Sequence, residues 1–324
     1  MEKNASNPYS LKEALAPAVR VLDKRSGTLA WTTVLGHNTS PAFPVDINRA
    51  TIGISASDHI GAYYLGAENS FTSTASTERY RIRLNNIPGI IRFNFETLRL
   101  SNSTNDGGHF ASQYSEPNTT YYAPGAMFNA PFGPNGILIF VGGVTAPKLS
   151  NDHFGSGWEN VFILDKSSNT SYYQQTTGDI PPLDPNISGP SIAQLKTTFF
   201  SAIDKKGQTF EIFVYGRWTP EFDTIYVLSL PSFTWHRTDF KTSSRRLEMQ
   251  CSGIDFNSQA ICVGGIDVPA ASGMNALYRN LSKDEWPNCI SVFDMSTWRM
   301  KDRYDADAPT YAANEKLKLV YESG

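Results

Sequence analysis

The chain alternates between short runs rich in apolar, β-branched and aromatic residues and polar segments rich in Gly, Pro, Asn and Ser. The pattern is clearest in residues 210–235, where the runs 210–215 and 225–230 are apolar at nearly every position and turn residues separate them. Short runs of this kind, bounded by turn signals, predict strands, and the continuous apolar character indicates burial on both faces. This stretch therefore predicts three strands inside a stack of sheets.

The same order of strands and turns recurs along the chain and predicts four complete four-stranded units. The strands expected for the first two units are 50–55, 61–67, 89–95 and 98–102, then 124–128, 136–143, 161–165 and 171–174. Those of the last two are 197–202, 210–215, 225–230 and the segment ending at Trp235, then 248–253, 259–265, 289–295 and 298–300. Residues 19–34 give the back half of a further unit. Repeated four-stranded antiparallel sheets predict an all-β fold, the β-propeller.

Two of these units share a finer pattern, in which an apolar strand ends in Gly-Gly and a later strand ends in Asp before a short turn. The pattern appears as Ile139-Phe140-Val141-Gly142-Gly143 with Leu164-Asp165, and as Ile261-Cys262-Val263-Gly264-Gly265 with Phe293-Asp294. The other units carry Leu65-Gly66-Ala67 and Tyr215-Gly216-Arg217 at the same place. The pattern resembles the kelch repeat, and residues 225–235 and 292–297 are similar to the kelch proteins of filamentous fungi. The resemblance covers roughly residues 19–310.

The resemblance implies a kelch-type β-propeller with four complete blades and a partial or composite blade. Its glycines are expected to adopt positive φ or to admit a neighbouring strand: Gly66, Gly142, Gly143, Gly216, Gly264 and Gly265. A residue after each short turn is expected to fill the wedge between neighbouring blades: Trp31, Leu100, Tyr173, Trp235 and Met300. The fungal relatives are typically secreted or membrane-anchored glycoproteins, so the resemblance suggests a secreted or cell-surface location.

The expected organisation is a lead-in at 1–18, the propeller at 19–310 and a tail at 311–324. Two ways of completing the ring follow from it. In one, residues 316–321 form an inner strand that completes the blade begun by 19–34, which gives five blades. In the other, blades present in the relatives are missing before Met1. The second is favoured because the relatives carry more blades and no secretion signal follows Met1.

The composition and net charge limit the classes of partner that we expect for this chain. Of the 324 residues, 40% are hydrophobic, 12% aromatic and 18% charged, the formal net charge is −3, and the sequence pI is near 6.0. Such a chain has no basic field to neutralise a phosphate backbone, so nucleic acid is not an expected partner. No run is long enough to span a bilayer. Asn-x-Ser/Thr glycosylation motifs leave a secretory origin open; they lie at Asn4, Asn38, Asn102, Asn118, Asn169, Asn186 and Asn280.

The chain shows no set of residues that predicts catalysis. The histidines lie far apart without metal-ligand spacing, and Cys251, Cys262 and Cys289 allow at most one internal disulfide, whose pairing stays open. Asp302, Asp305 and Asp307 beside Tyr304 would suit a cation, but a solvated turn is the favoured interpretation. Nucleotide-binding and nucleophile-elbow motifs are lacking. We therefore expect no catalytic residue, metal or cofactor.

Binding is the function that remains. Long, unequal loops join the second and third strands of the units at 68–88, 144–158, 217–223 and 266–287, and loops on a rigid scaffold commonly carry recognition. They contain the candidate binding residues Trp158, Arg217, Trp218, Tyr278 and Trp286, although each Trp is also suited to a small core under its loop. The sequence favours a noncatalytic propeller that binds an unidentified protein or carbohydrate. The alternative is an enzyme such as a copper-radical oxidase of the galactose oxidase type, for which no matched His, Tyr and Cys set is visible.

Overall fold

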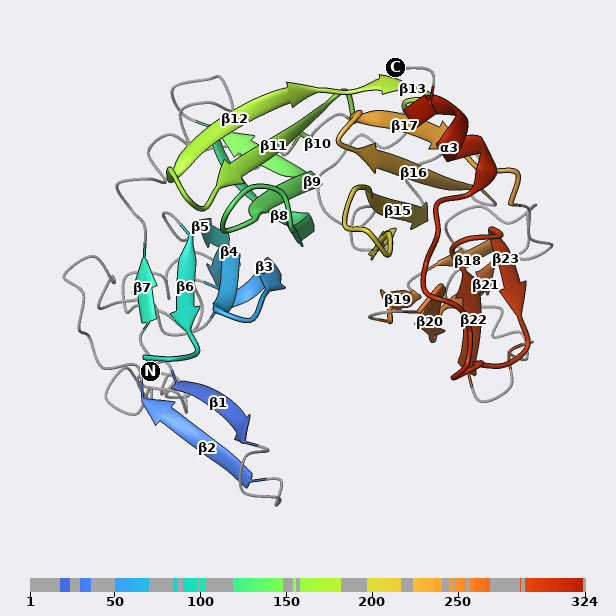
Figure 1. Cartoon of the computed structure of the whole chain (residues 1–324). Coiled ribbons are helices and arrows are strands. Elements are labelled where there is room, and N and C mark those ends of the chain that lie inside the picture. The colour runs from blue at the N-terminus through green and yellow to red at the C-terminus, as the bar shows by residue number, and fades with distance from the viewer. Residues whose placement is uncertain are drawn as a thin grey trace, which may run out of the picture.

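The protein consists mainly of four antiparallel sheets arranged side by side about a common centre (Figure 1). The computed structural model describes residues 18–23, 30–35, 50–69, 84–86, 90–97, 100–102, 119–147, 154–155, 158–181, 197–216, 224–240, 245–247, 249–254, 257–268, 286 and 289–322. The expected all-β, four-bladed propeller arrangement is confirmed.

Each blade follows the order predicted from the sequence. Blade 1 contains β3 (Ala50–Ser57), β4 (Gly61–Asn69), β6 (Ile91–Asn94) and β7 (Leu100–Asn102), with β5 (Leu84–Asn86) beside β4. Blade 2 contains β8 (Thr119–Ala130), β9 (Ile137–Pro147), β11 (Asn160–Asp165) and β12 (Thr170–Gln175), with β10 (Phe154–Gly155) beside β9.

Blade 3 contains β14 (Thr197–Ile203), β15 (Phe210–Gly216), β16 (Ile225–Leu230) and β17 (Thr234–Arg237), with β13 (Thr177–Gly178) parallel to β17. Blade 4 contains β19 (Gln250–Gly253), β20 (Gln259–Val263), β22 (Ile290–Asp294) and β23 (Arg299–Lys301). Two further pairs are β18 (Arg245–Leu247) with β21 (Ile266–Val268), and β1 (Ala18–Asp23) with β2 (Ala30–Leu35). In the described residues β1 and β2 pair only with each other, so their membership of a further blade stays a prediction.

The inner strands of neighbouring blades lie side by side, β3 against β8 and β14 against β19. Gly253 shows how close they come, because a Cβ at this position would lie 2.3 Å from the carbonyl oxygen of Ser201 on β14. The backbone of β19 also reaches across the gap, where the Cys251 N–H donates to Oγ1 of Thr198 over 2.9 Å. Blades 3 and 4 are therefore joined by backbone contacts as well as by side-chain packing.

Three hydrophobic cores fill the spaces between successive blades, one each for blades 1 and 2, 2 and 3, and 3 and 4. Residues of β15 alternate between two of them: Ile212 and Val214 face blade 2, whereas Phe213 and Tyr215 face blade 4. All six residues of β16 are buried, as the continuous apolar run predicted. The central strands of blades 2 and 3 therefore each belong to two cores at once.

The turn between the third and fourth strands has the same construction in three blades. Asn94 Oδ1 accepts hydrogen bonds from the N–H groups of Glu96 and Thr97, and Asp294 Oδ1 accepts those of Ser296 and Thr297. Asp165 Oδ1 accepts the N–H of Ser167. These polar residues end their strands because their side chains satisfy backbone donors of the turn.

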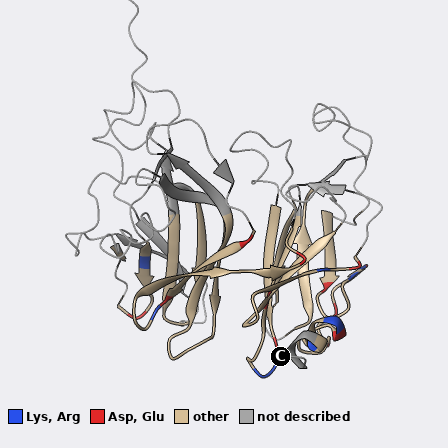
Figure 2. Ribbon diagram, turned by 90° about the horizontal axis from the view of Figure 1, so that it is seen from above, with Lys and Arg blue, Asp and Glu red and all other residues tan. Residues whose placement is uncertain are grey.

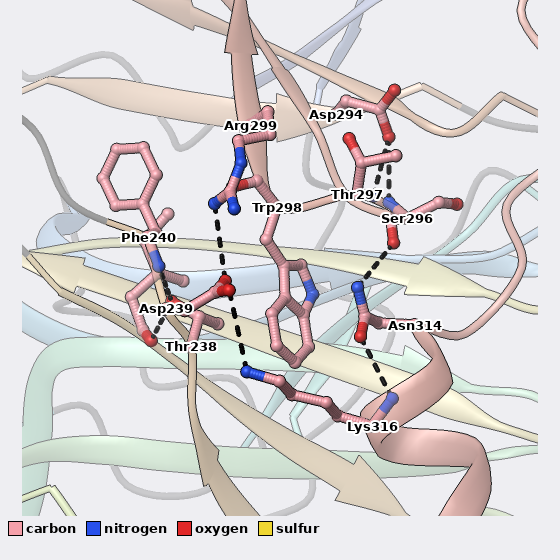
Figure 3. A network of polar contacts seen from close by, with 11 residues as sticks. Thr238, Asp239, Phe240, Asp294, Ser296, Thr297, Trp298, Arg299, Asn314 and Lys316 are labelled. Carbon is pink, nitrogen blue, oxygen red and sulfur yellow. Dashed lines mark hydrogen bonds and ion pairs between the residues drawn. The ribbon is translucent and has the colours of Figure 1, made fainter.

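The C-terminal strap, residues 301–322, corrects one expectation. Residues 316–321 were a candidate closing strand, but they lie in the helix α3 (Glu315–Glu322). Asn314 caps the helix by accepting the N–H of Lys316, and its Nδ2 donates to the Ser296 carbonyl in blade 4 over 2.9 Å (Figure 3). Tyr311 and Leu317 are buried in the core between blades 3 and 4. The strap therefore fastens this pair of blades; the predicted boundaries at 18, 19, 310 and 311 stay predictions.

The cysteine pairing is resolved. Cys251 and Cys262 face each other across β19 and β20 and form a disulfide, with their Cα atoms 4.1 Å apart, while Cys289 is an exposed thiol. No apolar helix of membrane-spanning length occurs in the described part of the chain.

Candidate functional site

The blades present two different rims. The first and second strands of each blade join at one rim, which we call the turn rim, and the third and fourth strands join there too. The second strands β4, β9, β15 and β20 run toward the opposite rim, the loop rim, from which the chain leaves before it returns to the third strand. In Figure 2 the charged residues of the described part of the chain lie mainly in turns, at strand ends and on α3. The scaffold therefore delivers four connecting segments to one face.

Trp158, expected as a loop-rim binding residue, lies inside the molecule. Its side chain is 2% exposed, and its ring packs edge-on against Trp235 at a centroid distance of 5.8 Å. The Trp158 carbonyl accepts hydrogen bonds from Nε1 of Trp235 over 3.0 Å and from Oγ1 of Thr176 over 2.7 Å. Trp158 therefore forms part of the core between blades 2 and 3, and it does not present a surface to a ligand.

Gly142 makes room for this tryptophan. Its φ is +65°, and a Cβ would lie 3.2 Å from the Trp158 ring. Gly264, at the equivalent position of the sequence pattern and directly after β20, has φ +73° but no neighbour within 4 Å of a Cβ. The two glycines therefore share a backbone conformation, and only Gly142 also accommodates a neighbouring ring.

The other repeat glycines have ordinary roles in the strands. Gly66 pairs with Gly53 between β4 and β3, and Gly216 ends β15 opposite Thr197. Gly143 continues β9, and Gly265 has φ +98° directly after Gly264.

The wedge residues differ from one blade to the next. Trp235 is fully buried between blades 2 and 3. Tyr173 is instead 52% exposed. It lies on the outer strand β12, where it pairs with Phe162 of β11. In blade 4 Trp298, in the turn, is fully buried, whereas Met300 is only partly buried. Trp31 lies in β2.

The remaining candidate binding residues divide into two groups. Trp286 is partly buried and packs against the core between blades 3 and 4. Arg217, Trp218 and Tyr278 lie outside the described residues. The expected loop-rim site is therefore neither assembled nor excluded by the described residues.

The turn rim carries a polar cluster that sequence reasoning missed. Lys166 Nζ lies 2.6 Å from Oδ2 of Asp58 and 2.6 Å from Oδ1 of Asn129, and it lies over the Tyr63 ring, 5.4 Å from the centroid. The side chains of Lys166 and Asp58 are only 7% and 5% exposed. The cluster joins blade 1 to blade 2, and no local pattern could reveal it because Asp58 and Lys166 are 108 residues apart.

Hydrogen bonding and burial shift the pKa values of this cluster. Burial acts to raise the pKa of Asp58, but the hydrogen bonds from Lys166 and from the N–H groups of Gly61 and Ile60 outweigh it and lower that pKa. Burial and the Asp58 carboxylate raise the pKa of Tyr63. The cluster is therefore a charged contact that is stable at neutral pH, and its lysine and aspartate are engaged with each other.

The other titratable candidates of the described residues do not form a metal-binding set. Burial lowers the pKa of His236 on β17, and the Asp179 carboxylate partly opposes this shift. Asp305 uses its Oδ1 to accept the N–H of Asp307, and the strand end and turn at 300–306 line an open depression. The described residues contain no group of three or more His, Cys, Asp or Glu side chains suited to a metal ion. His37, His109 and His153 lie outside them.

Comparisons with known proteins assign no family. No family model matches the chain, and no curated protein matches it in sequence. Among solved structures the chain is similar to one described as "Structure of YjhT", with a TM-score of 0.49 and 13% identity over 91% of this chain and 80% of that one. It is also similar to Trypanosoma rangeli sialidase, with a TM-score of 0.32 and 9% identity over 74% of this chain and 46% of that one. Neither similarity assigns an activity to this chain.

Proposed function

We propose that this β-propeller is a binding module that recognises a protein or a carbohydrate at its loop rim. The observation that carries the proposal is the common direction of β4, β9, β15 and β20, which brings four connecting segments of unequal length to one face. A rigid scaffold with variable segments on one face is a common arrangement for recognition. The segment after β15 begins with Arg217 and Trp218, which are residue types enriched at binding hot spots.

The proposal includes the kelch character of the repeat. Support comes from the positive φ of Gly142 within β9 and of Gly264 directly after β20, and from Asp165 and Asp294, whose side chains accept hydrogen bonds from the turns that follow. The exposure of Tyr173 and the burial of Trp298 are departures from the simplest form of that pattern.

A binding screen tests the proposal directly. The whole chain would be screened against a glycan array and against extracellular protein fractions, and each ligand found would be titrated with the variant Arg217→Ala/Trp218→Ala. We expect the double variant to weaken binding at least about tenfold, the loss typical of hot-spot residues. The matched control is Lys206→Ala/Tyr304→Ala, which removes an exposed cation from the β14–β15 turn on the turn rim and a 43% exposed tyrosine from the strap, and it should bind like the unmodified chain.

A copper titration tests the enzymatic alternative. Binding of one copper per chain with a radical-type visible spectrum would favour an oxidase over a simple binding module.

In the binding screen, equal ligand affinity for the double variant and the unmodified chain would remove Arg217 and Trp218 from the site.

A further inference from the structure

The outer strand of blade 2 differs from the outer strands of the other blades. β12 has six residues, whereas β7 and β23 have three each and β17 has four. β12 reads Thr-Ser-Tyr-Tyr-Gln-Gln and has no charge, whereas β23 contains Arg299 and Lys301. Proteins commonly protect sheet edges by keeping them short, charged or covered. By these criteria β12 is the least protected outer edge among the described strands.

The edge of β12 is accessible along its length. In the described part of the chain β12 pairs with β11 on one side and with no strand on the other. Thr170, Tyr172, Tyr173 and Gln175 are exposed, with Tyr172 at 50% and Tyr173 at 52%. Alternate residues of an edge strand direct their backbone groups away from the sheet, where another strand can pair with them.

Blade 3 shows how such an edge is used in this molecule. There the short extended segment β13 lies parallel to the outer strand β17. The Thr177 N–H donates to the Phe233 carbonyl over 3.0 Å, and the Asp179 N–H donates to the Trp235 carbonyl over 2.9 Å. An extended polar segment therefore already adds to one outer strand, and β12 and β13 follow each other along the outer perimeter (Figure 1).

The side chains around β12 indicate the chemistry of a partner. Tyr172 pairs with Ile163 and Tyr173 with Phe162, so the two rings lie on opposite faces of the blade and flank the edge on both sides. Carboxylates lie near both ends of the strand. Asp165 pairs with Thr170, and the Glu159 carbonyl accepts the Thr176 N–H. The Glu159 charge also reaches Tyr173, whose pKa is raised by burial and by this carboxylate.

Two cations lie near this strand among the described residues, and one of them is paired with a carboxylate. Lys166 is buried against Asp58, and Arg92 donates to Oδ1 of Asn169 over 2.7 Å. The surroundings of β12 therefore combine two exposed aromatic rings with a local excess of carboxylate, a combination that attracts arginine and lysine side chains.

We propose that the outer edge of β12 binds an extended basic peptide as an additional strand. Backbone hydrogen bonds along the edge would hold the peptide. Its alternate Arg or Lys side chains share one face, so they would lie against either Tyr172 or Tyr173, near Glu159 and Asp165. This site lies on the outer perimeter of blade 2 and is separate from the proposed loop-rim site.

A second copy of the chain fits this edge less well. Both copies would bring the same local carboxylates, Asp165 and Glu159, so a second copy offers no charge complementarity to this edge. A pair of six-residue strands also buries much less than the roughly 1,200 Å² at which stable interfaces begin.

Fluorescence polarisation with the labelled hexapeptide Arg-Val-Arg-Thr-Arg-Val tests the proposal. We expect saturable binding that weakens as salt rises, and no comparable binding of Glu-Val-Glu-Thr-Glu-Val. Two further versions of the arginine peptide carry backbone N-methyl groups. One is methylated at residues 1, 3 and 5, and the other at residues 2, 4 and 6. Because an added strand pairs through one of its edges, one of them should lose binding and the other should keep it.

Variants locate the site. Tyr172→Ala/Tyr173→Ala should weaken binding of the arginine peptide at least about fivefold, and Glu159→Gln about twofold or more, in line with exposed cation–π and charge contacts. Tyr304→Ala, which removes a tyrosine of similar exposure from the strap, is the matched control and should leave binding unchanged. Circular dichroism and thermal unfolding would verify that each variant folds.

Four results would overturn the proposal. They are no binding of the arginine peptide to the unmodified chain, equal binding of the two methylated peptides, equal losses in the tyrosine variants of β12 and the strap, and dimerisation in sedimentation that the β12 variant abolishes. The last would assign the edge to a second copy.

Discussion

Two constraints require a glycine at position 142, one on its backbone conformation and one on the space beside it. Its positive φ disfavours any side chain, and the Trp158 ring occupies the space that a Cβ would need. The sequence pattern of an apolar strand ending in glycine predicted the backbone role. The pattern could not predict the contact between Gly142 and the Trp158 ring. Trp158 follows 16 residues later, and its burial depends on Trp235 in the next blade.

Gly142→Ala should lower the free energy of unfolding by about 2–4 kcal/mol, combining strained backbone with displacement of the ring. Gly264→Ala is the matched control, since it has the same sign of φ and an open surrounding, and it should cost only about 1 kcal/mol. Urea unfolding of both variants measures the difference. Equal losses would show that the Trp158 contact contributes nothing.

Asp58 makes the stability depend on pH. The pKa of Asp58 is lower in the folded chain than in the unfolded chain. Its contribution to the free energy of unfolding is therefore complete above the unfolded pKa, and it is lost as the pH falls from the unfolded pKa to the folded pKa. Asp58→Asn should therefore destabilise the protein at pH 7 and flatten the fall in stability between about pH 5 and pH 3. Thermal unfolding across this range measures the effect. Asp302→Asn, which removes an exposed carboxylate, is the control for the change in net charge. A similar pH profile for both variants would show that Asp58 does not cause the pH dependence.

At the scale of the element, most strands could be predicted and the last element could not. Strands such as β15 and β16 carry their signal locally, in apolar runs cut by turn residues. Lys316-Leu317-Lys318-Leu319 alternates like a strand, which is why a closing strand was expected. Asn314 followed by Glu315 is an N-terminal helix signal, and it agrees with the cap that the structure shows.

The binding residues expected at the loop rim show that the sequence does not predict which aromatic side chains are exposed. Composition indicated aromatic residues after the second strands, but burial decides which of them reach a surface, and burial depends on partners far along the chain. Trp158 is buried by the next blade, whereas the exposure of Tyr172 and Tyr173 follows from the position of β12 at the perimeter.

The strap gives a prediction at this scale. Leu317 is fully buried between blades 3 and 4, so Leu317→Ala should cost about 2–5 kcal/mol of unfolding free energy. Leu319, on the same helix, is 66% exposed, and Leu319→Ala should change stability by less than about 0.5 kcal/mol. Denaturant unfolding measures both. Two small, equal effects would mean that α3 does not hold the blades together.

At the scale of the whole molecule, the three cores lie in series, and each is shared by two neighbouring blades. Such an arrangement behaves as a chain of nearest-neighbour interfaces. Distant interfaces should then contribute independently, whereas residues of one interface should be coupled.

Double-mutant cycles test this. Phe162 belongs to the core of blades 1 and 2 and Phe293 to that of blades 3 and 4, so Phe162→Leu and Phe293→Leu should add to within about 0.5 kcal/mol. Phe200 and Phe293 share one core with ring centroids 5.8 Å apart, and their Leu variants should depart from additivity by about 0.5 kcal/mol or more. Strong coupling of the distant pair would mean that the blades act as one unit.

The strap also sets an order of assembly during synthesis. The core of blades 1 and 2 draws on residues up to Leu164, and that of blades 2 and 3 on residues up to Trp235. The core of blades 3 and 4 needs Tyr311 and Leu317. Because a ribosome delivers the chain from its N-terminus, the first two interfaces can close while translation continues, whereas the third waits for α3 to emerge. Until then the apolar surface of blade 4 is the part of the nascent chain most in need of a chaperone.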